Sequence, residues 1–194
     1  LAGSLGNLTP FFAISFAVLL LGETPSNAQW IGIATISVGV TLLFLNDPEK
    51  NQQLTLLTLG LPIVAAMLRG GVQPFVKLGL ANWSSPLAAV TIGYVISALV
   101  ISGFIFIRQG NQGLPDRVGL AWFTTVGAVN GTAVLLLYIA LDNGPVTIVA
   151  PIVACYPLLT LVLNRFFLKD SHLNLSVFVG ILLTVMGIGF LLSS

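Results

Sequence analysis

The residue best suited to chemistry is Arg69, which stands in the middle of the apolar stretch LPIVAAMLRGGVQPFVKLGL. An arginine at the centre of a membrane-spanning helix costs about 2.5–3.5 kcal/mol on insertion scales. At helical spacing Gln73 and Lys77 fall on the same face, so this polar stripe is expected to line a cavity. A guanidinium offers paired donors to a carboxylate or phosphate. We therefore expect Arg69 to anchor a small anionic or zwitterionic metabolite, with Gln73 as a second donor.

A different interpretation of the stripe stays open. If the helix ends nearer to Arg69 than the apolar run indicates, the guanidinium snorkels to the membrane surface and binds nothing. Lys77 lies close to the end of the run and is expected to snorkel.

Other polar side chains fall at membrane depth, and each can hydrogen-bond either a ligand or a neighbouring helix. These cavity candidates are Asn7, Tyr94, Asn130, Tyr138 and Tyr156. For any one of them a purely structural hydrogen bond between helices is the favoured interpretation. Tyr156 gains some support as a cavity residue, because Pro151 and Pro157 free backbone carbonyls that need partners.

The composition is that of an integral membrane protein, with 56% hydrophobic and only 7% charged residues. A net charge of +1 without a basic run excludes nucleic acid as a partner. His172 and Cys155 are the single residues of their kinds, so no metal-ligating cluster and no cofactor are expected. Because no Asp or Glu lies within an apolar segment, an enzyme is not expected either.

The apolar segments predict seven transmembrane helices, since crossing about 30 Å of hydrocarbon takes about 20 helical residues. Strands are excluded because an open sheet edge cannot persist in lipid. The expected helices are 2–21, 28–45, 54–80, 87–107, 118–141, 146–168 and 173–192.

The stretch from Pro10 to Asn46 is repeated from Pro157 to the end of the chain. Both copies have a helix-entry proline, an apolar run, an acidic residue that closes it, and two glycines seven residues apart. The glycine pairs are Gly32 with Gly39 and Gly180 with Gly187, and they are expected to allow close helix packing, as is the GxxxG of Gly127 and Gly131.

The positions of the two copies predict a repeat of five helices. Residues 1–46 are then the last two helices of a first repeat, 47–53 a linker, and 54–194 a complete second repeat. Because five is odd, the repeats have opposite orientations, as in many secondary transporters. A ten-helix, inverted-repeat fold of five plus five helices follows, and about 95 residues with three helices are expected before Leu1.

The run PFFA, followed by LLLGE, QWIG and GVTLL, resembles EamA-type transporters of the drug/metabolite transporter superfamily, with Leu21, Gly22 and Glu23 as the most recognisable part. In the second copy Lys169 and Asp170 replace the usual Gly and Glu. The resemblance implies two five-helix repeats and a permease in the bacterial inner membrane that moves small metabolites, amino acids or drugs.

Two rival functions stay open beside a permease. One is a non-transporting membrane scaffold, and the other is a seven-helix receptor, although 173–192 has no lysine for a retinal Schiff base. The expected partners are a small-molecule substrate and the lipid bilayer, with a homodimer through the glycine-rich helices. The orientation stays open, because the distribution of Lys and Arg and the usual topology of the resembling family disagree.

Overall fold

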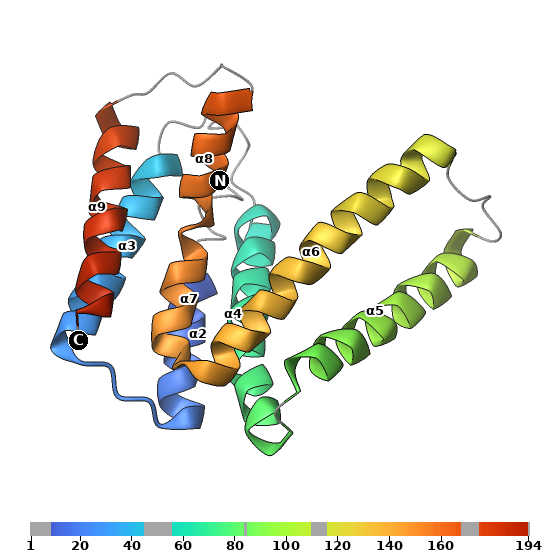
Figure 1. Ribbon diagram of the computed structural model, residues 1–194, viewed down its shortest axis with the longest axis horizontal. Helices are drawn as coiled ribbons and strands as arrows, with labels where there is room; N and C mark the ends of the chain where they lie inside the picture. Colours follow the sequence, from blue (N-terminus) through green and yellow to red (C-terminus); the bar gives the residue numbers. More distant parts are fainter. Residues whose placement is uncertain (1–8, 45–55, 84, 110–115, 168–174, 194) are drawn as a thin grey trace. The chain divides into compact units, whose positions relative to one another are not determined.

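A computed structural model describes residues 9–44, 56–83, 85–109, 116–167 and 175–193, and all regular structure in these ranges is helical (Figure 1). The all-α prediction is therefore confirmed for the described residues. The elements are α2 (Thr9–Phe16), the π-helical turn η1 (Ala17–Leu21), α3 (Asn27–Phe44), α4 (Leu56–Asn82), α5 (Pro86–Gln109), α6 (Arg117–Asn143), α7 (Val146–Ala154), α8 (Tyr156–Phe167) and α9 (Leu175–Leu192).

Four stretches of the described chain are long and apolar enough to cross a membrane: Gly60–Asn82, Pro86–Arg108, Arg117–Asn143 and Val146–Leu163. Shorter apolar helices cover Thr9–Leu21 and Val177–Leu192. These lengths support a protein that passes through the membrane several times. The ten-helix inverted repeat stays a prediction.

The chain forms two compact units. One contains residues 1–75 and 144–194, and the other contains residues 76–143, mainly α5 and α6. This division follows contacts in space, so it does not test the predicted repeat boundaries at 46 and 54.

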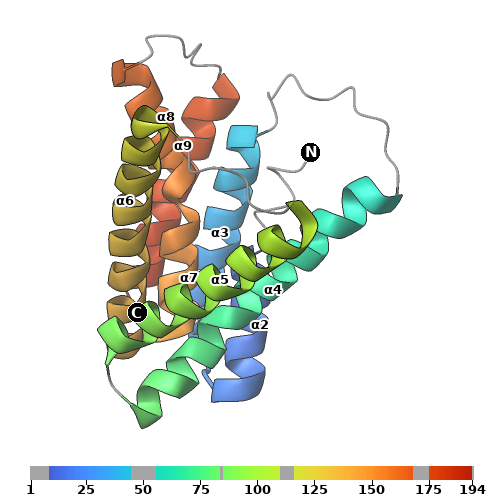
Figure 2. The same ribbon diagram turned by 90° about the vertical axis from the view of Figure 1, so that its right-hand side faces the viewer.

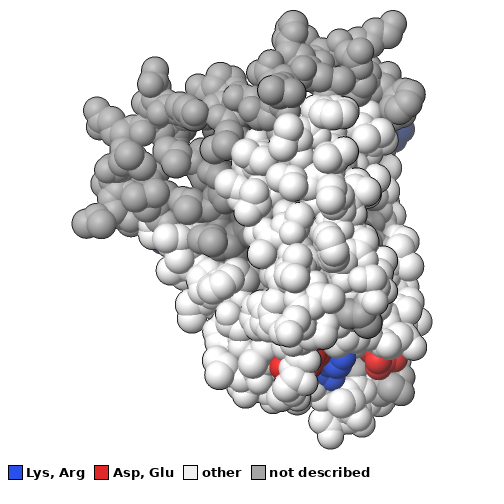
Figure 3. All heavy atoms as spheres, turned by 90° about the vertical axis from the view of Figure 1, so that its left-hand side faces the viewer, with Lys and Arg blue, Asp and Glu red and all other residues white. Residues whose placement is uncertain are grey.

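Large apolar side chains of α5 and α6, such as Leu99, Phe106 and Phe123, are exposed, as suits helices that contact lipid. Polar side chains within the helices satisfy themselves locally. The hydroxyls of Thr91, Thr124 and Thr132 donate to the carbonyl four residues earlier, so no unpaired hydroxyl donor faces lipid at these positions. Figure 3 shows one face of the molecule, on which most described side chains are uncharged.

The ends of the helices follow from local sequence. Ser26 and Gln29 form a capping box at the start of α3, in which each side chain bonds the backbone N–H of the other residue at 3.2 and 2.8 Å. Asp116 accepts a bond from the Gly119 N–H at 3.0 Å and so caps α6. Gly22 adopts a left-handed conformation with φ 66° and terminates η1.

Helices α3 and α9 pack against each other along a seam formed by Gly32, Gly39, Gly180 and Gly187 (Figures 1 and 2). A Cβ atom on Gly32 would lie 2.8 Å from the Gly187 carbonyl oxygen, and one on Gly39 would lie 2.8 Å from that of Gly180. Only glycine allows this approach, so the prediction that the glycine pairs bring helices together is confirmed for these positions. Gly127 and Gly131 face open space in the described part of the chain.

The pairing in the seam is reciprocal. By sequence Gly32 corresponds to Gly180 and Gly39 to Gly187, yet Gly32 meets Gly187 and Gly39 meets Gly180. Gly32 therefore contacts the counterpart of Gly39, and Gly39 contacts the counterpart of Gly32. Contacts of this kind are typical of a two-fold axis.

The prediction of one continuous helix over 146–168 is wrong in one respect. The structure has two helices there, α7 and α8, separated at Cys155. Pro157 has no N–H to donate to the Val153 carbonyl, and the Cys155 N–H bonds the Ile152 carbonyl at 3.1 Å in a tighter turn. Cys155 itself is buried and packs with Ile36 and Val40, as expected of a small packing residue.

Candidate functional site

Arg69 lies at the midpoint of the 27 residues of α4, roughly 20 Å from either end of the helix. The helix therefore continues well past Arg69 on both sides. Snorkelling of the guanidinium to the membrane surface stays the alternative to a binding role. No described carboxylate pairs with its guanidinium. The carboxylate of Glu23, the acid that closes α2 and η1, accepts hydrogen bonds from the first backbone N–H groups of α7.

Arg69 and Gln73 line a cavity of about 140 Å³ within the first unit. Its other walls come from the start of α2 and from the interruption between α7 and α8. They include Pro10, Val153, Ala154 and Tyr156. Three of the predicted site residues, Arg69, Gln73 and Tyr156, are thus brought together, although they come from distant parts of the sequence.

Gln73 is 9% exposed, and its Oε1 is buried without a hydrogen-bond partner in the described structure. Such an atom is uncommon in a folded protein and calls for an explanation, since an unpaired buried acceptor costs about 1–3 kcal/mol. We expected Gln73 to serve as a donor. The atom that lacks a partner is instead an acceptor, and it is buried, so a ligand donor could reach it only if the Gln73 side chain turned toward the cavity.

The cavity depends on a close approach of α4 to α2. A Cβ atom on Gly70 would lie 2.5 Å from the Thr9 carbonyl oxygen and 2.8 Å from the Ala13 nitrogen. The glycine next to Arg69 therefore holds this part of α4 directly against the start of α2 (Figure 2). One turn on, buried Pro74 leaves the Gly70 carbonyl without its helical partner.

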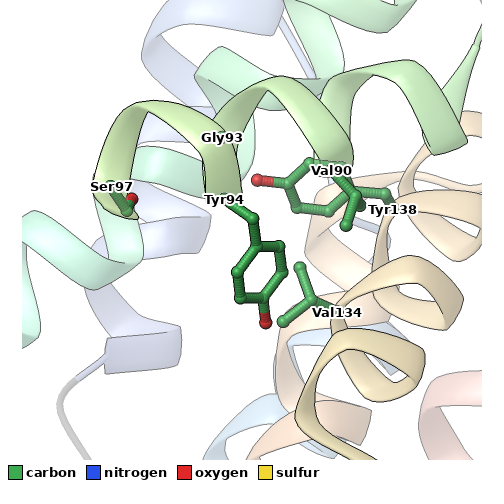
Figure 4. Close-up of a pocket in the computed structure, with 6 residues that line it drawn as sticks. All are labelled: Val90, Gly93, Tyr94, Ser97, Val134 and Tyr138. Carbon is green, nitrogen blue, oxygen red and sulfur yellow. The ribbon is translucent and has the colours of Figure 1, made fainter. Parts of the chain in front are cut away.

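Tyr94, Asn130 and Tyr138 lie in the second unit and are not among the residues that line the Arg69 cavity. The Asn130 Nδ2 donates to the Tyr94 hydroxyl at 2.7 Å and joins α6 to α5. Figure 4 shows Tyr94 reaching from α5 toward Val134 of α6, beside Tyr138, in a cavity of about 230 Å³. The Tyr94–Asn130 bond matches the structural alternative for these two residues. Asn7 lies outside the described residues.

A model of the EamA-like transporter family matches residues 1–45 and 56–193. The chain belongs to the EamA-like transporter family. No curated protein matches it. Members of this family are membrane transporters, and the match confirms the resemblance drawn from PFFA, LLLGE, QWIG and GVTLL. The match favours a transporter over a seven-helix receptor.

Sequence reasoning missed two residues of this EamA-like chain. Glu23 was taken only as the acid that closes an apolar run, although its place in the recognisable LGE motif was a signal. Gly70 was passed over, although a glycine pair directly after a central arginine is a signal for close helix packing.

Proposed function

We propose that this chain is part of a secondary transporter that moves a small anionic or zwitterionic metabolite, such as an amino acid, by alternating access. The observation that carries the proposal is that Arg69 and Gln73, whose Oε1 is buried and unpaired, line one cavity at the middle of a long apolar helix. Family membership supports transport but names no cargo.

The chemistry of the cavity supports this class of cargo. The guanidinium supplies a planar pair of donors for a carboxylate, and the Gln73 acceptor suits an ammonium or hydroxyl group on the same molecule. A volume of about 140 Å³ fits a small metabolite, since pockets for drug-sized ligands measure roughly 300–1,000 Å³. The interruption at Cys155 beside the cavity resembles the broken helices that form midplane sites in inverted-repeat transporters.

The proposal includes the ten-helix inverted repeat, with 1–46 as the end of the first repeat and 54–194 as the second. The reciprocal glycine seam supports it. We also propose the bacterial inner membrane as the location. A homodimer through glycine-rich helices stays a prediction, for which Gly127 and Gly131 are available.

The cargo class is tested with four small molecules of equal carbon number: L-alanine, L-lactate, propionate and n-propylamine. We expect thermal stabilisation of the purified transporter to be largest with L-alanine and L-lactate, smaller with propionate and absent with n-propylamine. Flux of L-alanine or L-lactate into proteoliposomes then separates a carrier from a scaffold. Stabilisation by n-propylamine but not by the acids would contradict the anion site.

Gln73→Leu is expected to separate folding from recognition. The unliganded protein should be as stable as wild type or more stable, because a buried unpaired acceptor is removed. L-Lactate should then stabilise the variant no better than propionate does, because the hydroxyl has lost its acceptor. Both effects are measured by thermal unfolding with and without each acid. A retained preference for L-lactate would show that Gln73 does not read the donor group.

A further inference from the structure

The carboxylate of Glu23 joins residues of the first and the second predicted repeat. Its Oε1 accepts a bond from the Val146 N–H at 2.8 Å, and its Oε2 accepts one from the Thr147 N–H at 2.9 Å. We call this pair of bonds the latch. Glu23 follows α2 and η1, whereas Val146 and Thr147 begin α7, which directly precedes the second copy. The negative charge also complements the positive end of the α7 dipole.

The latch lies at the start of α7, and the Arg69 cavity lies further along the same helix. Val146 and Thr147 begin the helix, whereas Ala150, Val153 and Ala154 line the cavity. At about 1.5 Å per helical residue the cavity wall begins roughly 6 Å from the latch and extends to roughly 12 Å, in a hydrocarbon core of about 30 Å. A cavity near the middle of the membrane therefore places the latch near one surface.

The stretch between the latch and the cavity is closed. Ala13 and Ala17 on the side of α2, and Val146 on α7, are 0% exposed, and Ala150 at the edge of the cavity is 2% exposed. Helices α2 and α7 pack together here. A solute can pass from the cavity toward the Glu23 surface between these helices only if α2 and α7 separate, and separation breaks both bonds of the latch.

We propose that Glu23 is the latch of a gate, so that its bonds to α7 stabilise the transporter with the Glu23 side closed. This inference rests on the proposed transport function. Glu23 acts as a positioning residue and does not contact the cargo. Glu23→Gln keeps the shape of the side chain but removes the charge and leaves one N–H of α7 facing an amide donor. Because charge-assisted hydrogen bonds are about twice as strong as neutral ones, the open fraction should rise about tenfold.

The test follows the accessibility of a buried position at the gate. Val146→Cys is introduced together with Cys155→Ser, and a charged thiol reagent that does not cross membranes is added to right-side-out and inverted vesicles. With Glu23 present the new thiol should react slowly from both sides. With Glu23→Gln its rate should rise about tenfold from one side only.

Two controls separate gating from a loosened fold. Asp116→Asn removes another carboxylate cap. That cap lies within one helix end and joins no second helix, so Asp116→Asn should leave the labelling rate of Val146→Cys unchanged. Thr184→Cys reports on the α3–α9 seam, where Thr184 is 0% exposed, and it should stay unreactive in both backgrounds.

The gate is ruled out if the Val146→Cys rate does not change with Glu23→Gln, if Asp116→Asn raises it equally, if both sides respond alike, or if the seam thiol also becomes reactive. The labelling requires no cargo. A negative labelling result therefore says nothing against the cargo test with L-alanine and L-lactate. A negative cargo test likewise does not change how the labelling result is interpreted.

Discussion

Replacing Arg69 by alanine is expected to reduce transport of L-alanine or L-lactate into proteoliposomes about 100-fold, while the protein still reaches the membrane. The loss follows because a guanidinium at the midpoint of α4 is the only described cation lining the cavity, and its paired bonds to a carboxylate would have no replacement. A factor of 100 corresponds to about 2.7 kcal/mol, within the range for a hydrogen bond to a charged group.

Membrane insertion should not suffer from this change. An arginine at helix centre costs about 2.5–3.5 kcal/mol to insert, so alanine makes α4 easier to place in the bilayer. Arg69→Lys keeps the charge but loses the paired donors and should fall between alanine and wild type. The expected order of transport rates is therefore arginine, then lysine, then alanine at equal protein amounts.

Arg108 provides a matched arginine control. It lies in the last turn of α5, with its guanidinium carbon 5.4 Å from the centre of the Phe104 ring, and does not line the Arg69 cavity. Arg108→Ala should leave transport near normal. Unchanged transport in Arg69→Ala at normal expression, or an equal loss in Arg108→Ala, would remove Arg69 from the site and the anion hypothesis with it.

Gly39→Val is expected to give the largest loss of stability. The first added carbon would lie 2.8 Å from the Gly180 carbonyl oxygen and 2.8 Å from the Thr184 nitrogen, and it would also overlap the Thr184 Oγ1. Two of these atoms belong to the backbone of α9, so no change of side-chain rotamer relieves the overlap. The helices must separate, at about 3 kcal/mol, the upper end of the usual cost of overpacking.

Gly127→Val is the control for this substitution. Gly127 is also a glycine in a helix interior, but a Cβ atom there meets nothing within 4 Å among the described residues. The same gain in helix propensity applies to both variants. The yield of folded protein and its thermal unfolding in detergent should fall for Gly39→Val and hardly change for Gly127→Val. Equal behaviour of the two would mean that the seam does not hold α3 and α9 together.

The sequence predicted those features of the site that depend on a single helix. Arg69 and Gln73 share a face because residues four apart do so in any α-helix, and a charge in a long apolar run is visible in the residues alone. The sequence does not predict which of the other polar candidates line the Arg69 cavity and which bond each other elsewhere. Tyr156 joins Arg69, whereas Tyr94 and Asn130 bond each other, and periodicity does not tell which helices are neighbours.

By itself the sequence determined that this protein is helical and spans the membrane, because a chain so poor in charge must satisfy its backbone internally in lipid. It also revealed the repeated glycines, because repeats need no coordinates to be found. Only the tertiary structure decided that Gly32 meets Gly187, that the helix after Val146 is interrupted at Cys155, and that Glu23 holds the start of α7. These contacts join residues far apart in the chain, and their partners are set by how helices pack rather than by the residues beside them in sequence.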